Sequence, residues 1–185
     1  MGFVQLFKDF FGMVALDEKA YKRATKTRFK TTFLVFLLIA IAIAIGSVFI
    51  IKPKSGGIGG AFVYLFIYSL LLMPIIWLFI TTIFWGSARL FGGKGGFQAH
   101  YNGLSITMLW AVLCAIPFIG FLLAGAGSLW TIIMNIFFVR ELHKLPTGKA
   151  VFAVMIPYTI FIIILLLLLV GIFFLYLTMT QSLTN

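Results

Sequence analysis

The residues most suggestive of chemistry lie in one short segment, RLFGGKGGFQAHYNG, which covers residues 89–103. Four glycines surround Lys94, and His100 follows. A phosphate-binding loop needs Gly-Lys-Ser/Thr directly after a strand, so that a hydroxyl holds Mg²⁺ while backbone amides surround the phosphates. Here Gly95 follows the lysine, and long apolar runs lie on both sides of the segment. The pattern therefore predicts a turn between two helices and no nucleotide binding.

Other candidates for chemistry are few. His100, His143 and Glu141 have side chains that bind zinc, but their spacing matches no ligand motif, and we interpret the two histidines as surface residues. The apolar runs contain no Asp, Glu, Lys or Arg, one of which a proton relay or an ion path usually needs. We therefore expect no catalytic residue, no metal site and no cofactor, in a protein that is not an enzyme.

The composition indicates the class of protein. Of 185 residues, 63% are hydrophobic and 10% are charged, and the mean hydropathy is +1.17. A water-soluble domain carries about 25% charged residues, so this chain cannot form a soluble surface. The one cysteine, Cys114, lies inside an apolar run and gives no disulfide framework. We expect an integral membrane protein.

The apolar runs predict an all-α polytopic bundle with five transmembrane helices. A crossing helix needs about 20 apolar residues, and the runs that meet this condition cover about residues 32–51, 60–85, 97–116, 118–139 and 150–179. Residues 97–139 carry no charge over 43 residues, twice one crossing, so Pro117 in PFIG is expected to turn the chain. These runs make up one domain, residues 32–185. The alternative is four crossings with a long re-entrant third element.

The distribution of Lys and Arg predicts the orientation. With the N-terminus in the cytoplasm, the inner segments 1–31, 86–96 and 140–149 hold twelve cationic residues, whereas the outer segments hold only Lys52 and Lys54. Short loops rich in Lys and Arg stay on the cytoplasmic side. We therefore expect a cytoplasmic N-terminus and an outer C-terminus. The four-crossing alternative would bring the C-terminus inside.

Residues 1–31 are expected to form a cytoplasmic segment that starts with an amphipathic helix lying in the membrane interface. Apolar residues recur there at helical spacing. The predicted interfacial anchors are four phenylalanines, Phe3, Phe7, Phe10 and Phe11.

A second helix is expected to follow, with Asp17 as its cap, and to lead into the first crossing. It carries five cations at a spacing that places them on one face: Lys19, Lys22, Arg23, Lys26 and Lys30. These cations either fix the topology alone or contact anionic lipid headgroups or an acidic partner. Nucleic acid is not an expected partner, because no aromatic residues project beyond the membrane surface to stack on bases.

Polar and small residues inside the apolar runs indicate helix packing. The most polar are Asn102, Ser105 and Asn135, which we expect to form hydrogen bonds between helices. Six further residues are expected at close helix contacts or at breaks that form hinges: Pro74, Pro117, Gly120, Ala124, Ser128 and Pro157. The alternative function is a small transporter or channel, in which the three polar residues and Tyr68 line a path between crossings two, three and four. An intramembrane enzyme ranks third.

Several motifs follow one another in the second half of the chain. Leu/Phe-Gly-Gly-Lys-Gly precedes the third crossing, and IPFIGF joins the third to the fourth. Trp130 lies early in the fourth crossing, and His-x5-Lys-Ala, from His143 to Ala150, begins the fifth, with Pro157 following. In the order and spacing of these motifs, residues 89–157 resemble the membrane domain of the Yip (Ypt/Rab-interacting protein) family, whereas the first half is similar only in topology. The resemblance implies a five-crossing bundle with a cytoplasmic N-terminus.

Eukaryotic members of that family act in vesicle traffic between the endoplasmic reticulum and the Golgi, and they associate with prenylated Rab GTPases. Their Asp-Leu-Tyr-Gly-Pro motif is absent here, and only about thirty residues precede the first crossing. The chain is more similar to a compact prokaryotic member, and fold transfers better than function. We expect a scaffold or organiser of a prokaryotic cell membrane. Its expected partners are anionic lipids, other membrane proteins or further copies of itself.

Overall fold

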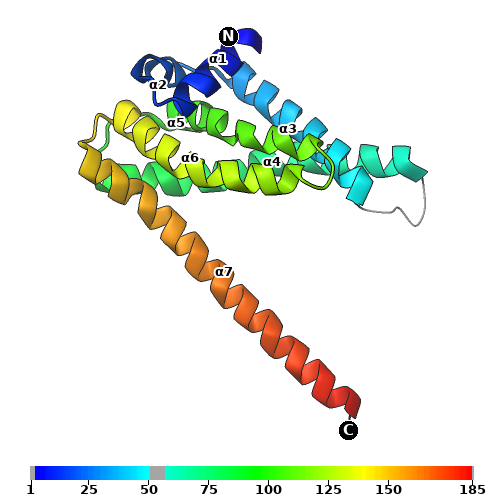
Figure 1. The fold of residues 1–185 in the computed structure, drawn as a ribbon. Helices are drawn as coiled ribbons and strands as arrows, with labels where there is room; N and C mark the ends of the chain where they lie inside the picture. Colours follow the sequence, from blue (N-terminus) through cyan, green and yellow to red (C-terminus); the bar gives the residue numbers. More distant parts are fainter. Residues whose placement is uncertain (1–2, 51–56, 185) are drawn as a thin grey trace.

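The computed structural model describes residues 3–50 and 57–184, and all regular structure in these ranges is helical (Figure 1). The elements are, in chain order, α1 Phe3–Val14, α2 Glu18–Ala24, α3 Phe29–Ile50, α4 Gly57–Leu90, α5 Phe97–Leu104, the 3-10 helix η1 Ser105–Ala115, α6 Gly120–His143 and α7 Thr147–Thr184. The predicted all-α class is confirmed. Lys52 and Lys54, the predicted outer cations, lie outside the described residues.

Four helices of the described chain are long and apolar enough to cross a membrane: α3, α4, α6 and α7. Each coincides with one of the predicted crossings, although α4 and α7 extend further than predicted. The predicted third crossing, residues 97–116, is divided between the eight residues of α5 and the eleven of η1. No single long helix therefore corresponds to it, and the count of five crossings stays a prediction.

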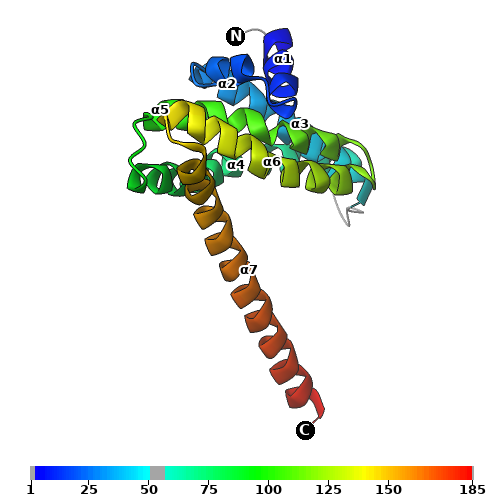
Figure 2. The ribbon, with the colours of Figure 1, turned by 60° about the vertical axis from the view of Figure 1, so that its left-hand side comes forward.

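The helices α3, α4 and α6 and the α5–η1 segment lie side by side in one bundle (Figures 1 and 2). Within it, η1 packs against both α3 and α6. The buried core includes Phe36, Ile39, Ile106, Leu109, Met134 and Phe138. Glycine permits the closest approaches, because a Cβ at Gly46 would overlap the carbonyl oxygen of Cys114 and a Cβ at Gly120 would overlap that of Leu113. The backbones of α3 and α6 therefore lie directly against the end of η1.

The predicted row of small residues on α6 is only partly correct. Gly120 lies at a close contact and Ala124 is half-buried. Ser128, however, is exposed, and its hydroxyl donates to a carbonyl of its own helix at 2.6 Å. The second close contact is Gly127, against which the ring of Trp110 packs. The face of α6 that meets η1 therefore contains Gly127 and not Ser128.

The three prolines have different effects on their elements. Pro117 lies in the turn between η1 and α6, as predicted. Pro74 and Pro157 lie inside α4 and α7, and both helices continue past them. The prediction that these two prolines break their helices is wrong. A membrane helix tolerates proline where neighbouring groups or local adjustments satisfy the backbone groups that it frees.

Beyond its first turns, α7 leaves the bundle. Its beginning packs against α4 and α6, and the ring centroids of Phe84 and Tyr158 are 5.3 Å apart. Further on, α7 points away from the other helices in both views (Figures 1 and 2), and residues 159–174 are exposed. With 38 residues, α7 is about 57 Å long, against roughly 30 Å for a hydrocarbon core. The exposed surface of α7 is so apolar that it requires lipid or other membrane helices around it.

Candidate functional site

The cationic segments of the described chain gather at one end of the bundle, where α2, the α4–α5 loop and the α6–α7 turn lie close together (Figure 1). Lys94 of the loop donates its backbone N–H to the His143 carbonyl at 3.2 Å. Arg140 on α6 forms an ion pair with Glu18 on α2 at 3.6 Å. We call this region the basic end; it comprises residues 17–30, 89–96 and 140–149. Three segments that are distant in the sequence thus meet in space.

The glycine-rich loop between α4 and α5 forms a tight turn, as predicted. The Gly93 N–H donates to the Ala88 carbonyl at 2.9 Å, and Gly92 has φ +88°, a left-handed conformation that favours glycine. The loop lies directly on His143, because a Cβ at Gly93 would be 2.5 Å from its Nδ1 atom. The Gly95 N–H donates to the same nitrogen at 3.2 Å. The loop backbone therefore contacts the His143 imidazole and the end of α6.

His100 and His143 form a buried pair, which corrects their interpretation as surface residues. The distance from His100 Nδ1 to His143 Nε2 is 2.8 Å, and both side chains are almost fully buried. Because His143 Nδ1 accepts the Gly95 N–H, a neutral His143 carries its proton on Nε2 and donates it to His100. The pair thus joins α5, α6 and the glycine-rich loop.

The histidine pair does not belong to a larger group of metal ligands. Among the described residues, no group of three or more His, Cys, Asp or Glu side chains is placed to hold a metal ion. Glu141, the third candidate zinc ligand, forms an ion pair with Lys144 at 2.7 Å. Zinc sites have three or four protein ligands, so the pair fits a hydrogen-bonded link between helices better than a zinc site.

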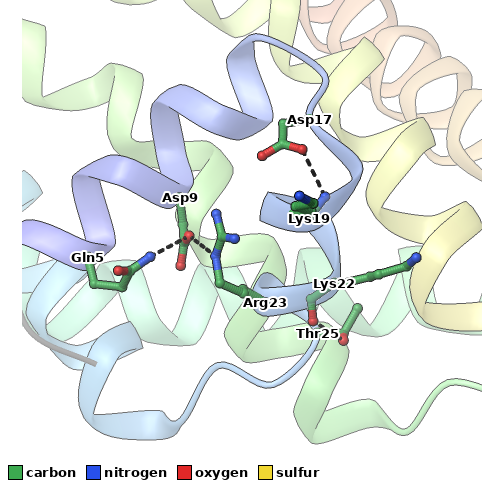
Figure 3. Close-up of polar contacts among 7 residues, drawn as sticks. All are labelled: Gln5, Asp9, Asp17, Lys19, Lys22, Arg23 and Thr25. Atoms are coloured by element: carbon green, nitrogen blue, oxygen red, sulfur yellow. Dashed lines mark hydrogen bonds and ion pairs between the residues drawn. The ribbon is translucent and has the colours of Figure 1, made fainter.

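A network of polar contacts fixes α1 to α2 (Figure 3). Arg23 Nε lies 2.6 Å from Asp9 Oδ1, to which the Gln5 amide also donates at 2.8 Å. Asp9 is fully buried, so its charge needs a partner of opposite sign. The Tyr21 hydroxyl adds a hydrogen bond to the Met13 carbonyl at 2.8 Å. The two short helices therefore form one unit, which their sequence spacing did not reveal.

The predicted cap of α2 is present. Asp17 accepts a hydrogen bond from the Lys19 N–H at 3.0 Å, as Figure 3 shows. Inside α2, burial raises the pKa of Tyr21, because its ionised form would lose hydration, and the nearby Arg140 cation lowers it by less. Tyr21 therefore stays protonated and keeps its role as a hydrogen-bond donor.

The α1–α2 unit lies along the flank of the bundle. Trp130 on α6 donates its indole N–H to the Val14 carbonyl at 3.1 Å. The rings of Phe10 and Trp110 meet edge to face with centroids 5.4 Å apart. Trp130 stands thirteen residues, about 20 Å, before the end of α6. The end of α1 therefore lies beside the middle of α6.

The four predicted anchors of α1 do not share one environment. Phe3 and Phe11 are exposed, and Phe7 is half-buried. Phe10 is only 6% exposed and packs into the core, so it is not an interfacial anchor. Val4 is exposed and completes the outer apolar face. The helix is thus apolar on two faces, one toward the bundle and one outward.

The five predicted cations do not lie on one continuous helix. Residues 25–28 form a turn between α2 and α3. In this turn the Thr25 hydroxyl donates to the Lys22 carbonyl at 2.9 Å, a local bond that competes with continuation of a helix. Arg23 is engaged by Asp9 and has a structural role. The other four remain on the surface: Lys19, Lys22, Lys26 and Lys30.

The polar residues of the predicted third and fourth crossings form hydrogen bonds between helices, as expected. Asn102 Oδ1 accepts from the Thr32 hydroxyl on α3 at 2.9 Å. The Ser105 hydroxyl lies 3.4 Å from the same Thr32 hydroxyl. Asn135 on α6 donates to the Tyr158 hydroxyl on α7 at 3.0 Å. These bonds connect α3 to α5 and α6 to α7.

The suggested transport path is not favoured by this arrangement. Asn102 and Asn135 are engaged in separate contacts between different helices. Tyr68 on α4 is 54% exposed and stacks on Tyr64, with centroids 6.0 Å apart. The residues suggested for one path therefore belong to three different environments.

Comparison with known proteins agrees with the membrane character of the chain. The model of the Yip1 domain family matches residues 18–180, from the start of α2 into the last part of α7. No curated protein and no solved structure shows significant similarity to the chain. The matched range contains the glycine-rich loop and the histidine pair, and it begins after α1. The match confirms the resemblance of residues 89–157 and extends it to the first half of the bundle.

Proposed function

The chain belongs to the Yip1 domain family of membrane proteins, and we propose that it is a non-enzymatic membrane organiser that gathers anionic lipid around its basic end. The proposal rests on the difference between the acidic side chains, which all have partners within the protein, and the cations, most of which are exposed. All four acidic side chains are engaged: Asp9 with Arg23, Glu18 with Arg140, Glu141 with Lys144, and Asp17 as the cap of α2. Apart from Arg23, which pairs with Asp9, the exposed cations of the N-terminal segment are Lys8, Lys19, Lys22, Lys26, Arg28 and Lys30. An anionic surface is the partner that fits them.

The strength of this attraction comes from the number of charges. Each exposed cation near an anionic membrane surface contributes about 1 kcal/mol. Several together enrich anionic lipid, although one contact alone is weak. These charges are screened over about 10 Å at 0.1 M salt, so the enrichment falls as ionic strength rises. The net charge of +10 also attracts anionic lipid.

The outer face of α1 extends the lipid contact into the acyl region. Phe3, Val4 and Phe11 are each more than half exposed. Lys8 beside them reaches toward the headgroups while its methylene groups stay in lipid. Asp9 is unfavourable at this depth, but its pairing with Arg23 offsets the charge. In this proposal α1 lies within the cytoplasmic leaflet, along the flank of the bundle.

In the same proposal, α5 and η1 together act as the third crossing. Eight α-helical residues rise about 12 Å and eleven 3-10 residues about 22 Å, so the segment extends over about 34 Å. A hydrocarbon core is about 30 Å thick, so this length is sufficient. Five crossings then place the basic end and the N-terminus in the cytoplasm and the C-terminus outside. The resemblance to compact members implies a prokaryotic cell membrane.

Lipid retention by charge variants tests the proposal. One variant changes Lys19, Lys22, Lys26 and Lys30 to Gln, and its matched control changes the same four to Arg, which keeps the charge. Arg23 is left in place because it pairs with Asp9. Each protein is purified from bilayers of phosphatidylglycerol and phosphatidylcholine, and its retained lipids are counted by native mass spectrometry at low and high salt.

The glutamine variant is expected to retain less phosphatidylglycerol than the wild type at low salt, and the arginine variant as much. High salt should reduce the retention by the wild type and by the arginine variant. Retention that is the same for the wild type and the glutamine variant at both salt concentrations would show that these lysines serve only as a topology signal.

A further inference from the structure

An open cavity of about 250 Å³ lies at the basic end, between the α2–α3 turn and the first turn of α5. The lining residues that matter for its chemistry are Lys26, Thr27, Arg28, Phe29, Gln98 and Asn102. Two of them are cations, and no acidic residue lines the cavity. Drug-sized ligands occupy roughly 300–1,000 Å³, so this cavity fits an anion of headgroup size.

Thr27 provides the cavity with an unused hydrogen-bonding group. Its side chain is 7% exposed, and its hydroxyl has no hydrogen-bond partner among the described residues. A buried hydroxyl without a partner is unfavourable, so a ligand oxygen at this point would stabilise it. The neighbouring hydroxyl of Thr25 is already bonded to the Lys22 carbonyl. The Thr27 hydroxyl oxygen is enclosed, so Thr27 offers a ligand a partner once its side chain turns toward the cavity.

Asn102 holds the cavity in shape. It is 2% exposed, and its amide donates to the Thr27 carbonyl at 3.3 Å while its Oδ1 accepts from the Thr32 hydroxyl at 2.9 Å. These bonds fix the turn against α5 and α3, so little ordering is needed when a ligand binds. The 22-residue helix α3 also begins beside the cavity, at Phe29, and the positive end of its dipole favours an anion there.

A row of exposed apolar side chains leads from the cavity along α3. Phe29 borders the cavity and is 60% exposed. Four further exposed residues follow it at multiples of four positions: Phe33, Ile41, Ile45 and Phe49. Residues four apart are neighbours on a helix, and their row is inclined to the helix axis, so it winds partly around α3 as it runs away from the basic end toward the hydrocarbon, with Leu37 half-buried between Phe33 and Ile41. An acyl chain fits along such a row, whereas a free phosphate ion would not use it.

We propose that this cavity binds the phosphate group of a single phospholipid whose acyl chain follows the row on α3. Lys26 and Arg28 balance the phosphate charge, and the Thr27 hydroxyl donates a hydrogen bond to a phosphate oxygen. This assignment deepens the proposed function, on which it rests. In addition to the anionic lipids that the surface lysines attract without a fixed site, one lipid is bound at this defined site.

Native mass spectrometry of the full chain in detergent tests the site, with phosphatidylglycerol and inorganic phosphate as separate probes. We expect the wild type to bind one phosphatidylglycerol at low lipid concentration and to bind inorganic phosphate much more weakly. Arg28→Gln is expected to weaken this first lipid roughly tenfold, since it removes one charge-assisted contact. Thr27→Val keeps the shape and should weaken it severalfold, whereas Thr27→Ser keeps the hydroxyl and should bind as the wild type does.

The control is Lys149→Gln, which removes an exposed charge that lies neither in the cavity nor among the four lysines of the charge variant, and it should leave the first lipid unchanged. Melting temperatures without lipid show whether each variant is folded. Inorganic phosphate that binds as tightly as phosphatidylglycerol would overturn the lipid assignment. Folded Arg28→Gln and Thr27→Val variants that bind the first lipid normally would overturn the site. In that case the proposed function would still stand if the four-glutamine variant lost anionic lipid, and would fall if it did not.

Discussion

Arg23 on α2 lies 2.6 Å from the Asp9 carboxylate on α1, and this ion pair connects the two helices that precede the first crossing. Asp9 is fully buried, whereas the Arg23 side chain is 45% exposed. The arginine thus covers a carboxylate that α1 carries into the interior. As a consequence, the charge of Arg23 is balanced by Asp9, whereas the charges of the lysines around it act on lipid.

Replacement of Arg23 by glutamine is expected to destabilise the protein by roughly 1–3 kcal/mol, because Asp9 would stay buried without its charged partner. Lys22→Gln removes a charge at the neighbouring exposed position and should change stability little. Thermal unfolding in detergent measures both variants. Adding Asp9→Asn to Arg23→Gln should recover part of the loss. Equal melting temperatures for Arg23→Gln and Lys22→Gln would contradict the structural role of Arg23.

Two glycines of the glycine-rich loop, Gly93 and Gly96, are expected to respond differently to replacement by alanine. A Cβ at Gly93 would lie 2.5 Å from His143 Nδ1 and 2.7 Å from the Ala88 carbonyl oxygen, whereas a Cβ at Gly96 would meet nothing within 4 Å. Gly93→Ala is therefore expected to lower the free energy of unfolding by about 1–3 kcal/mol, as overpacking does, and Gly96→Ala to leave it nearly unchanged. Thermal unfolding again provides the measurement. A Gly93→Ala protein as stable as the Gly96→Ala protein would show that the loop does not press on His143.

The features that the sequence predicted well depend on neighbouring residues. Apolar length and flanking charge are local properties, so residues 118–139 were predicted for a helix that spans Gly120–His143. The turn at the glycine-rich loop and the Asp17 cap likewise follow from a few adjacent residues. The 3-10 form of η1 was not predictable in this way, because an apolar pattern indicates burial without distinguishing one kind of helix from another.

The contacts at the candidate site depend on the folded chain. Asp9 and Arg23 are 14 residues apart, and His100 and His143 are 43 apart. Both histidines stand near the ends of apolar runs, and His143 lies between Glu141 and Lys144, which is typical of surface positions. His143 is buried because the glycine-rich loop folds over it, and His100 is buried against His143 and the ring of Phe138. The break in the basic helix at Thr25 also escaped prediction, since the charge spacing fits a continuous helix equally well.

The α5–η1 segment provides a test of the number of crossings. In a background with Cys114→Ser, single cysteines replace Gln98 at the start of α5 and Phe118 after η1, both of which are exposed. If the segment crosses the membrane, a membrane-impermeant maleimide should label Gln98→Cys only from the cytoplasmic side and Phe118→Cys only from the outer side. Right-side-out and inverted vesicles give the two accessibilities. Labelling of both cysteines from the same side would favour the re-entrant, four-crossing alternative.

Two adjacent phenylalanines report separately on the two faces of α1. Phe10 is 6% exposed and packs edge to face with Trp110, whereas Phe11 is 62% exposed. Phe10→Ala is expected to lower the free energy of unfolding by about 3 kcal/mol, because it removes a buried ring and leaves a cavity. Phe11→Ala should lower the melting temperature in detergent much less while reducing the lipid retained around α1, because its ring is mostly exposed and meets the protein by edge-to-face packing on Phe10, with centroids 5.4 Å apart. Melting curves and lipid counts are compared for the two variants. If Phe11→Ala proved as destabilising as Phe10→Ala, the outer face of α1 would be packed against protein and not against lipid.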